Sequence, residues 1–495
     1  MSFIELAKRI LNVTRTEKGD LAYVTSGSAA LDYFYMVGGK RFDEQSSLKL
    51  FVKAYLEDPK TALKLLLFTR DIKEGLGERE TFRFLLKMLA IYEPDVAKKL
   101  IPYIAKYGRY DDLLALLNTK VEDEVLKLIK NQLDEDLENK KANKPISLLA
   151  KWLPSINTSN KKARENALYI CNKLGFSKAD YRKTLSYLRK GLILENNLRE
   201  KDYSFSYESV PSVAMHYYRK AFQRNDKERY ESYIESVSNG DKEMNIGVLD
   251  IASFIKHATE DLKHRANHPY YEATWKKLVE ECVFNSRTLV VRDGSGSMYY
   301  YRISPWYAPI DIANALTMLT AARIQGEFAN KFITFSERPE LVDMSKMDSL
   351  FKKLAYLKTF NDISTTNIQA VYQLVIDIYK HPDFKKEDAL DQIMIVSDME
   401  FDELAGLDID EEMSTFEYFK GEFSKIGYKM PELIFWNVAS REEKVPVTMN
   451  EQGVKLISGG NKNIINIVIN TKALDPFDFM NKVLANYAFI DEIME

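Results

Sequence analysis

The chain has 495 residues, which is too long for one typical hydrophobic core and predicts two or three domains. Hydrophobic residues make up 45% and charged residues 29%, an ordinary composition for a soluble globular protein. No run of about 18 apolar residues occurs, so no membrane-spanning helix is expected. The two cysteines, Cys171 and Cys282, are too few for a disulfide framework and fit a cytoplasmic protein.

The net charge of −3 conceals an uneven distribution along the chain. Residues 161–230 contain 16 Lys and Arg against 8 Asp and Glu, a net of +8. Residues 391–440 contain 12 acidic residues against 3 lysines, a net of −9. The basic segment favours an anionic partner such as nucleic acid. The alternative is a set of helices whose charged faces are simply solvated.

The first 280 residues have the pattern of one helix after another. Apolar residues recur at three- and four-residue spacing, and short breaks with Gly or Pro separate the segments. The first predicted helices are 31–39, 48–58, 61–75, 80–93 and 95–108, and a long charged helix follows at 121–141. Helical hairpins stacked in series predict an all-α, HEAT-like ring or crescent, although no strict repeat period is present.

From about residue 285 the pattern changes to strands that alternate with helices. Buried-strand segments occur at 287–293, 331–336, 392–398, 432–438 and 454–458. This alternation predicts a doubly wound α/β domain around a parallel sheet. We therefore expect a helical domain at 1–282, an α/β domain at 283–475, and a C-terminal helix at 476–495 that packs on the rest.

Polar side chains follow two of the predicted strands. Asp293 ends the first strand and leads into Ser295 and Ser297. Asp398 ends the third strand, and Thr366 lies in a loop directly before a helix. The carboxyl ends of parallel strands meet at one edge of a sheet, so these side chains should converge there. Oxygen donors alone suit Mg²⁺ or Mn²⁺ and suit zinc poorly. Because few of the donors are negative, the ion would keep positive charge and could take an acidic group from a partner.

The first loop, DGSGS, leaves other interpretations open. Gly294 and Gly296 allow a tight turn, and in an extended turn Ser295 and Ser297 face the same side. A phosphate-binding loop is disfavoured because the lysine of a P-loop is absent. Nucleophilic catalysis by either serine would need a base, and no histidine lies near in the sequence. We therefore expect a binding protein and not an enzyme, with a metal-dependent hydrolase as the weakest alternative.

The order of these residues resembles a known motif. Asp293, Ser295 and Ser297, then Thr366, then Asp398 are similar to the metal-ion-dependent adhesion site (MIDAS) of von Willebrand factor A domains. The resemblance implies a von Willebrand A, Rossmann-like fold for the second domain, with a bound Mg²⁺. Thr366 is chosen over the threonine before it because the segment TTNIQA resembles the family pattern, although a threonine replaces the family's glycine.

Longer segments resemble an uncharacterised domain-of-unknown-function family, which joins an N-terminal helical region to a C-terminal von Willebrand A domain. The similar segments are 148–159, 210–222, 396–403 and 431–438. The layout is also similar to that of TROVE proteins, including the Ro autoantigen, in which a ring of HEAT-like helices binds small non-coding RNAs. The resemblance therefore implies an RNA-binding helical domain.

The segment RDIKEGLGERE, residues 70–80, resembles an Arg-Gly motif shared by these proteins. The residues of interest in it are Arg70, Lys73, Gly75, Gly77 and Arg79. We expect that its charged residues, with Glu78, form ion pairs around a turn between two helices. Direct contact with RNA is the second interpretation.

Basic residues alternate with aromatic residues inside the basic segment. Lys and Arg can bind phosphates, and aromatic rings can stack on bases. The candidate RNA contacts are Lys161, Lys162, Arg164, His216, Arg219, Lys220 and Arg224. For the neighbouring aromatics Tyr217 and Phe222, core packing is favoured over stacking on bases.

The sequence thus favours a non-enzymatic, RNA-binding scaffold with a Mg²⁺ site. The alternative function is a protein-interaction adaptor that works without RNA. In that case the metal would hold a carboxylate of a partner protein, for example beside an AAA+ ATPase.

Overall fold

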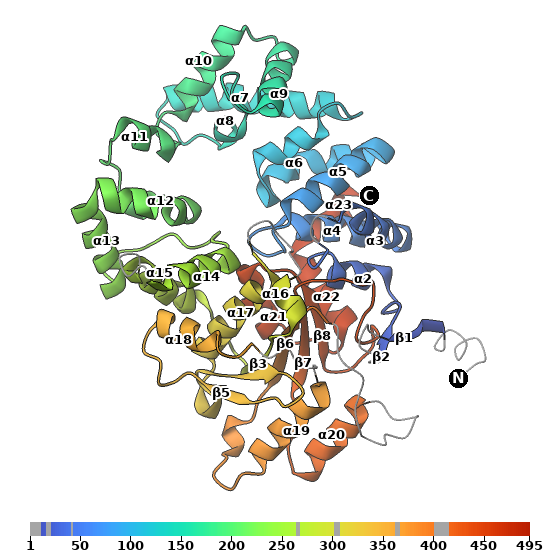
Figure 1. Cartoon of the computed structure of the whole chain (residues 1–495). Helices are drawn as coiled ribbons and strands as arrows, with labels where there is room; N and C mark the ends of the chain where they lie inside the picture. Colours follow the sequence, from blue (N-terminus) through green and yellow to red (C-terminus); the bar gives the residue numbers. More distant parts are fainter. Residues whose placement is uncertain are drawn as a thin grey trace.

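An arc of helices and an α/β domain make up the molecule (Figure 1). The computed structural model describes residues 11–15, 21–40, 43–263, 268–300, 307–361, 367–399 and 415–495. Helices from the first part of the chain trace the arc, which begins and ends on the α/β domain. The predicted fold class, a helical region followed by a doubly wound α/β domain, is confirmed.

The helices of the arc follow one another in chain order. They are α2 (Ala29–Met36), α3 (Glu44–Glu57), α4 (Pro59–Arg70), α5 (Arg79–Tyr92), α6 (Pro94–Tyr107), α7 (Glu122–Lys141), α8 (Leu149–Trp152), α9 (Lys161–Lys173), α10 (Lys178–Arg189), α11 (Leu194–Glu200), α12 (Ser212–Asn225), α13 (Lys227–Asn239), α14 (Ile251–Glu260) and α15 (His268–Glu281). A 3₁₀ helix, η1 (Tyr110–Leu116), lies between α6 and α7. The carboxylate of Asp58 shows how α3 and α4 are separated, because it accepts hydrogen bonds from the N–H groups of Lys60 and Thr61. No helix in the described part of the chain is long and apolar enough to cross a membrane.

The α/β domain is built on a six-stranded sheet in the order β5-β4-β3-β6-β7-β8. The strands are β3 (Thr288–Asp293), β4 (Lys331–Phe335), β5 (Leu341–Asp343), β6 (Gln392–Ser397), β7 (Glu432–Asn437) and β8 (Val454–Ser458). All five predicted strands are present and run parallel. Strand β5, which pairs antiparallel with β4, was not predicted, because three residues are too few for a periodic pattern.

The helices of this domain include the predicted C-terminal segment. They are α16 (Gly296–Tyr300), α17 (Pro309–Arg323), α18 (Leu350–Leu357), α19 (Ile368–Tyr379), α20 (Thr415–Lys425), α21 (Ile465–Asn470), α22 (Pro476–Leu484) and α23 (Phe489–Ile493). Helix α22 packs on β8, α2 and α4. Phe489 stacks on Tyr107 of α6 with ring centroids 5.6 Å apart. The C-terminal segment therefore connects the α/β domain with the beginning of the arc.

A small antiparallel pair near the N-terminus was not predicted. It consists of β1 (Val13–Arg15) and β2 (Leu21–Tyr23). Tyr23 and Val445 exchange two backbone hydrogen bonds, of 2.9 and 3.0 Å. The N-terminal segment is therefore fastened to the α/β domain before the arc begins.

The two ends of the arc meet on the loop that follows β8. Asn461 Nδ2 donates to the carbonyl oxygens of Ile72 (2.9 Å) and Gly75 (2.7 Å), between α4 and α5. Asn463 Nδ2 donates to Ile72 O (2.8 Å) and to Gly247 O (2.9 Å), just before α14. One asparagine side chain thus bridges the two ends, so the helical arc is closed through the α/β domain.

A close contact also brings α2 to the carboxyl edge of the sheet. The N–H of Gly38 donates to Ser458 Oγ at the end of β8 (3.1 Å). A Cβ atom on Gly38 would lie 2.7 Å from the backbone nitrogen of Gly459, so a larger residue does not fit there. The beginning of the arc therefore packs beside the edge at which the predicted metal ligands lie.

Candidate functional site

Two buried carboxylates meet at the carboxyl edge of the sheet. Strands β3 and β6 are parallel neighbours, with Arg292 opposite Val396. Asp293 at the end of β3 accepts a hydrogen bond from Ser397 Oγ at the end of β6 (2.5 Å). Asp398 follows directly, and the exposed fractions of Asp293 and Asp398 are 0% and 2%. The parallel register thus places these two predicted ligands side by side.

The loop after β3 folds over the Asp293 carboxylate. The N–H of Ser295 donates to Asp293 Oδ1 (2.8 Å), and the hydroxyl oxygens of Ser295 and Ser297 lie 3.1 Å apart. The two serines therefore face the same side, as expected. Neither Gly294 nor Gly296 is among the glycines with positive φ, so this turn does not use the backbone freedom expected of them.

These donors fit a hard divalent cation. Mg²⁺ binds six oxygens at about 2.1 Å in an octahedron, so two adjacent ligand oxygens lie about 3.0 Å apart. The 3.1 Å separation of the Ser295 and Ser297 hydroxyls matches that spacing. No three His, Cys, Asp or Glu side chains form a metal-binding group among the described residues, so a cation here would depend on hydroxyl donors. Thr366, the remaining predicted ligand, lies outside the described residues.

Arg292, for which no role was predicted, anchors the loop after β3 to neighbouring segments. Its buried guanidinium donates to Asn314 Oδ1 (2.7 Å) on α17 and to the carbonyl of Phe360 (2.8 Å). It also donates to the hydroxyl of Tyr299 on α16 (3.3 Å). Burial lowers the pKa of this guanidinium from its ordinary value. Arg292 therefore joins the loop after β3 to the segment that precedes Thr366. Its role could have been suspected from the sequence, because a charged residue stands inside an apolar strand.

Asp398 lies in a strained turn beside an arginine. Met399, the next residue, has φ of +65°, a conformation that is unfavourable for a side chain of this size. The N–H of Met399 donates to Ser397 Oγ (3.0 Å), which holds the turn. Arg441 Nε, from the segment after β7, lies 3.3 Å from Asp398 Oδ2. This turn keeps the Asp398 carboxylate at the sheet edge.

The Arg-Gly motif contributes to a buried cluster of ion pairs in the arc. Asp112 is completely buried and accepts from Arg70 Nε (2.7 Å), Arg83 Nε (2.6 Å) and the N–H of Arg109 (2.8 Å). Asp111 pairs with Arg83 and Arg109 (2.7 and 2.9 Å). We call these five residues the arginine cluster.

The rest of the motif is arranged differently from the expectation. Lys73 is exposed, and Arg79 is an exposed residue that pairs with Glu80 (2.7 Å) and not with the cluster. Gly77 has φ of +72°, and a Cβ atom on Gly75 would overlap the carbonyl oxygen of Phe68. The two glycines therefore shape the α4–α5 turn. Of the charged residues in the motif, Arg70 pairs within the arginine cluster and Arg79 pairs with Glu80 outside it.

The predicted RNA contacts fall into an exposed and a buried group. Lys161, Lys162 and Arg164 are exposed in the first turn of α9, and Lys220 and Arg224 are exposed on α12. The structure leaves all five accessible to a partner.

His216 and Arg219 of α12 correct the prediction, because both are buried. His216 Nε2 lies 2.9 Å from His257 Nδ1, and Arg219 pairs with Asp261 (3.3 Å) and Tyr271 (2.7 Å). Burial, followed by the charges of Arg219 and His257, lowers the pKa of His216 to about 3. These two side chains hold α12, α14 and α15 together and offer no surface for a phosphate or a base.

Tyr217 was assigned to the core, but 63% of it is exposed. Val213, Tyr217, Lys220 and Arg224 follow one another at steps of four, three and four residues, which places them on one face of α12. Helix α12 lies on the opposite side of the arc from α5 and α6 (Figure 1). We call these four residues the α12 stripe.

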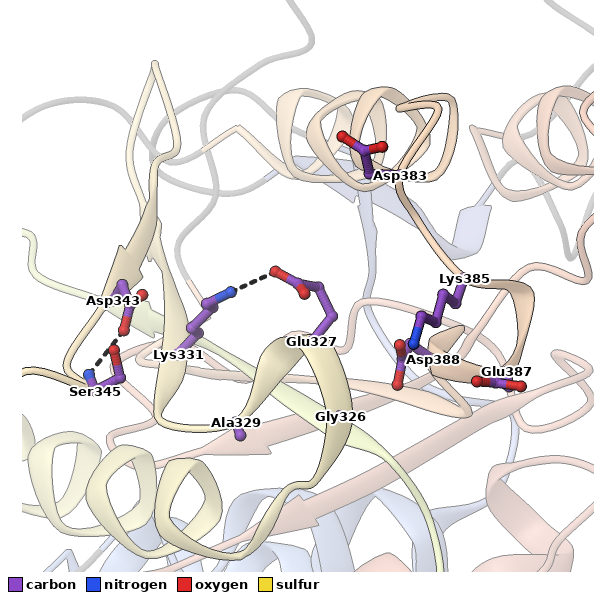
Figure 2. A pocket seen from close by; sticks show the side chains of 10 residues that line it. All are labelled: Gly326, Glu327, Ala329, Lys331, Asp343, Ser345, Asp383, Lys385, Glu387 and Asp388. Carbon is purple, nitrogen blue, oxygen red and sulfur yellow. Dashed lines mark hydrogen bonds and ion pairs between the residues drawn. The ribbon is translucent and has the colours of Figure 1, made fainter.

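A charged hollow lies at the other edge of the sheet, where β4 begins. It has a volume of 490 Å³, and its charged lining includes Glu327, Lys331 and Asp343 (Figure 2). Lys331 pairs with Glu327 (2.7 Å), and Asp343 accepts from the N–H of Ser345 (2.7 Å). Much of the charge in this hollow is therefore satisfied within the protein.

Sequence comparison identifies the family. The family model described as "Domain of unknown function (DUF2828)" matches residues 16–132 and 121–287, more than half of the chain. The chain belongs to this family. A second model, "Domain of unknown function (DUF7788)", matches residues 287–486. The predicted membership of an uncharacterised family is thus confirmed.

Individual relatives are similarly uncharacterised or distant. An uncharacterized protein of Acanthamoeba polyphaga mimivirus is 27% identical over 520 aligned residues, which cover 96% of this chain and 88% of that protein. The crystal structure of the Deinococcus radiodurans RO (RSR) protein aligns over 92% of both chains, with 12% identity and a TM-score of 0.34. A likeness at that TM-score supports no statement about function.

Proposed function

We propose that this protein is a non-enzymatic, RNA-binding scaffold whose helical arc contacts single-stranded RNA. The observation that carries the proposal is the α12 stripe, which presents an exposed tyrosine with two basic residues on one helix face. An exposed aromatic ring provides a stacking surface for a base, and neighbouring Lys and Arg bind the phosphates. The buried side of the same helix, with His216 and Arg219, keeps the stripe rigid.

The helical pair α9–α10 extends this basic surface. Residues 161–190 contain nine Lys and Arg against Glu165 and Asp180, a net charge of +7. Much of the charge imbalance of the basic segment is therefore concentrated on two successive helices. Such a concentration attracts a polyanion and makes its binding dependent on salt.

The test is the affinity of the full chain for a fluorescent single-stranded RNA of about 20 nucleotides, measured by anisotropy at several salt concentrations. The variant combines Tyr217→Ala, Lys220→Glu and Arg224→Glu. We expect Kd to rise at least about tenfold, with a shallower salt dependence, because a stacking surface and two phosphate contacts are lost.

The matched control is Lys385→Glu with Lys386→Glu, which makes the same change of charge in the α/β domain. The control should bind RNA within about twofold of the unmodified protein. Equal affinity of the α12 variant and the unmodified protein would contradict the proposal. Equal losses of RNA affinity in the α12 variant and the control would mean that net charge alone, and not the α12 stripe, determines binding.

We also propose that Asp293, Ser295, Ser297, Thr366 and Asp398 hold Mg²⁺ or Mn²⁺. The support is the donor chemistry and the 3.1 Å spacing of the two hydroxyls. The ion would supply a positive charge at the carboxyl edge of the sheet. The chain's own contribution is to hold the donors in place through Ser397 and Arg292.

We assign no catalytic step to these serines. Their hydroxyls lie within hydrogen-bonding distance of each other, and the described histidines are engaged elsewhere. His216 and His257 contact each other, His268 stacks on Phe351, and His381 lies 3.7 Å from Asp383. Nucleophilic catalysis would need a base beside the hydroxyl.

A second candidate function is an adaptor that binds an acidic group of a protein partner through the metal, without RNA. The hydroxyl-rich donor set favours it, because a divalent ion with few negative ligands retains attraction for a carboxylate. The absorbance ratio of the purified protein at 260 and 280 nm, with and without nuclease, separates the two. Co-purifying RNA favours the scaffold, and its absence favours the adaptor.

A further inference from the structure

The segment after β7 forms a rigid turn beside the metal ligands. The N–H of Val438 donates to the carbonyl of Ser397 (3.0 Å), which continues the pairing of β6 with β7. Asn437 then donates from Nδ2 to Ser440 Oγ (2.5 Å) and accepts at Oδ1 from the N–H of Ala439 (3.1 Å). The next residue, Arg441, is therefore projected from a fixed backbone.

The guanidinium of Arg441 lies against Asp398. Its Nε is 3.3 Å from Asp398 Oδ2. The Arg441 side chain is 22% exposed and that of Asp398 is 2% exposed, so the guanidinium lies on the more open side of the pair. An arginine keeps its charge at any ordinary pH. A cation that binds Asp398 must therefore compete with the guanidinium for this carboxylate.

The helical arc holds the backbone of Arg441. Lys40, just after α2, donates from Nζ to the carbonyl oxygen of Arg441 (3.0 Å). The N–H of Ser440 donates to the carbonyl oxygen of Gly39 (3.2 Å). The position of Arg441 beside the metal ligands thus depends on residues of the other domain.

We propose that Arg441 is the built-in counter-charge of the metal site and sets its affinity for a divalent cation. The inference rests on the proposed metal site. Without a cation, the guanidinium of Arg441 provides a positive charge beside the buried Asp398 carboxylate. When a cation binds, the guanidinium withdraws from Asp398, and the loss of this ion pair weakens cation binding. Because Lys40 binds the carbonyl oxygen of Arg441, a shift of the arc would move the Arg441 guanidinium relative to Asp398.

The test is binding of Mn²⁺ to the full chain, followed by the paramagnetic resonance signal of the free ion. Arg441→Gln removes the competing charge, so Mn²⁺ should bind about tenfold more tightly than to the unmodified protein. Arg441→Lys keeps the positive charge on a side chain of different length and shape. Its affinity for Mn²⁺ should lie between those of the unmodified protein and Arg441→Gln. If Arg441→Gln does not fold, Arg441→Lys alone still has to raise the affinity.

A second pair on the same two strands provides the matched control. Arg287 precedes β3 and lies 3.7 Å from Asp391, which precedes β6, at the opposite edge of the sheet. Arg287→Gln removes the same charge from the same sheet, and Mn²⁺ affinity should stay within about twofold, because salt screens a charge so far away. Lys40→Met should tighten Mn²⁺ about threefold, because the Arg441 backbone loses its support from the arc.

The outcomes separate this inference from the metal site itself. Tighter binding in Arg441→Gln, or binding that is detectable in that variant alone, supports the inference. Equal or weaker binding in Arg441→Gln overturns it and leaves the metal site standing if the unmodified protein binds Mn²⁺. If neither protein binds Mn²⁺, both the inference and the metal site are wrong.

Discussion

The loop after β3, which we call the metal loop because it carries the proposed ligands Asp293, Ser295 and Ser297, and the arginine cluster each contain a completely buried aspartate. The hydrogen-bond partners of the two carboxylates differ. Asp112 receives two guanidinium groups and a backbone N–H from its own domain. Asp293 receives a hydroxyl and a backbone N–H, with further serine hydroxyls beside it. One carboxylate is neutralised by cations of the chain, whereas the other is surrounded by neutral donors.

Two similar motifs therefore lead to different proposals. The DGSGS loop after β3 and the Arg-Gly motif after α4 both combine glycines with charged residues in a turn. A buried carboxylate with matching arginines is a structural element, because its charge is already balanced. A buried carboxylate among hydroxyls can accept an additional cation. The partners of the carboxylate, and not the motif itself, are therefore our reason for proposing a binding site at Asp293 and a structural role for Asp112.

The largest expected effect is the loss of the arginine cluster. Asp112→Asn leaves the buried Arg70 and its neighbour Arg83 without their shared counter-charge. The free energy of unfolding, measured by urea titration, should fall by about 3–5 kcal/mol. Asp134→Asn removes an exposed partner of Lys130 and should change the free energy of unfolding by no more than about 0.5 kcal/mol. Similar values for the two variants would mean that the cluster is not structural.

The turn of the Arg-Gly motif should be nearly as sensitive. In Gly75→Ala the new methyl group would overlap the carbonyl of Phe68 and lie 2.9 Å from that of Asp71, so the turn must shift. We expect the free energy of unfolding, measured by urea titration, to fall by about 2–4 kcal/mol. Gly247→Ala is the control, because a Cβ atom there meets nothing within 4 Å. A tolerated Gly75→Ala would show that the turn has room to relax.

The buried His216 should stay neutral, because burial and the nearby charge of Arg219 lower its pKa. Its pKa is lowered to about 3, so the folded protein excludes a proton that the unfolded chain binds below about pH 6.5. Its contribution to stability is therefore present above about pH 6.5 and is lost as the pH falls toward 3, by about 1.4 kcal/mol per pH unit. His216→Gln should reduce that slope by about one proton, measured by urea unfolding at several pH values. An unchanged slope in His216→Gln would contradict the lowered pKa of His216.

The smallest effect on stability is expected in the metal loop, together with the largest effect on cation binding. Asp293→Asn with Ser295→Ala removes a charge and a hydroxyl from the donor set. Divalent-cation binding by calorimetry should be lost, while the free energy of unfolding in the absence of metal changes by less than about 2 kcal/mol. Unchanged Mg²⁺ affinity would refute the metal site. A large loss of stability would make Asp293 a structural residue like Asp112.

The sequence predicted the sheet and the position of its site well. Continuous apolar runs identified β3, β4, β6, β7 and β8, because a strand buried on both faces needs no long-range information to be recognised. The same reasoning placed Asp293 and Asp398 at one edge, since both end parallel strands. It could not find Arg441, which follows β7 and reaches Asp398 through a turn held by the other domain.

Exposure on the helices was predicted less well. His216 and Tyr217 are adjacent, and the sequence assigned the first to RNA and the second to the core. The structure places them the other way round, because burial depends on which neighbouring helices pack against each face of α12. Charge and aromatic content alone do not contain that information.

The sequence by itself determined the fold class, the strands and the oxygen-rich donors, because periodicity and the ends of strands are local properties of the chain. Only the tertiary structure decided how these parts are joined. Asn463 and Ile72 are 391 residues apart, yet their hydrogen bond helps to close the arc. Arg441 reaches Asp398 from a backbone that Lys40 holds. Contacts of this kind depend on packing between domains, which no local pattern specifies.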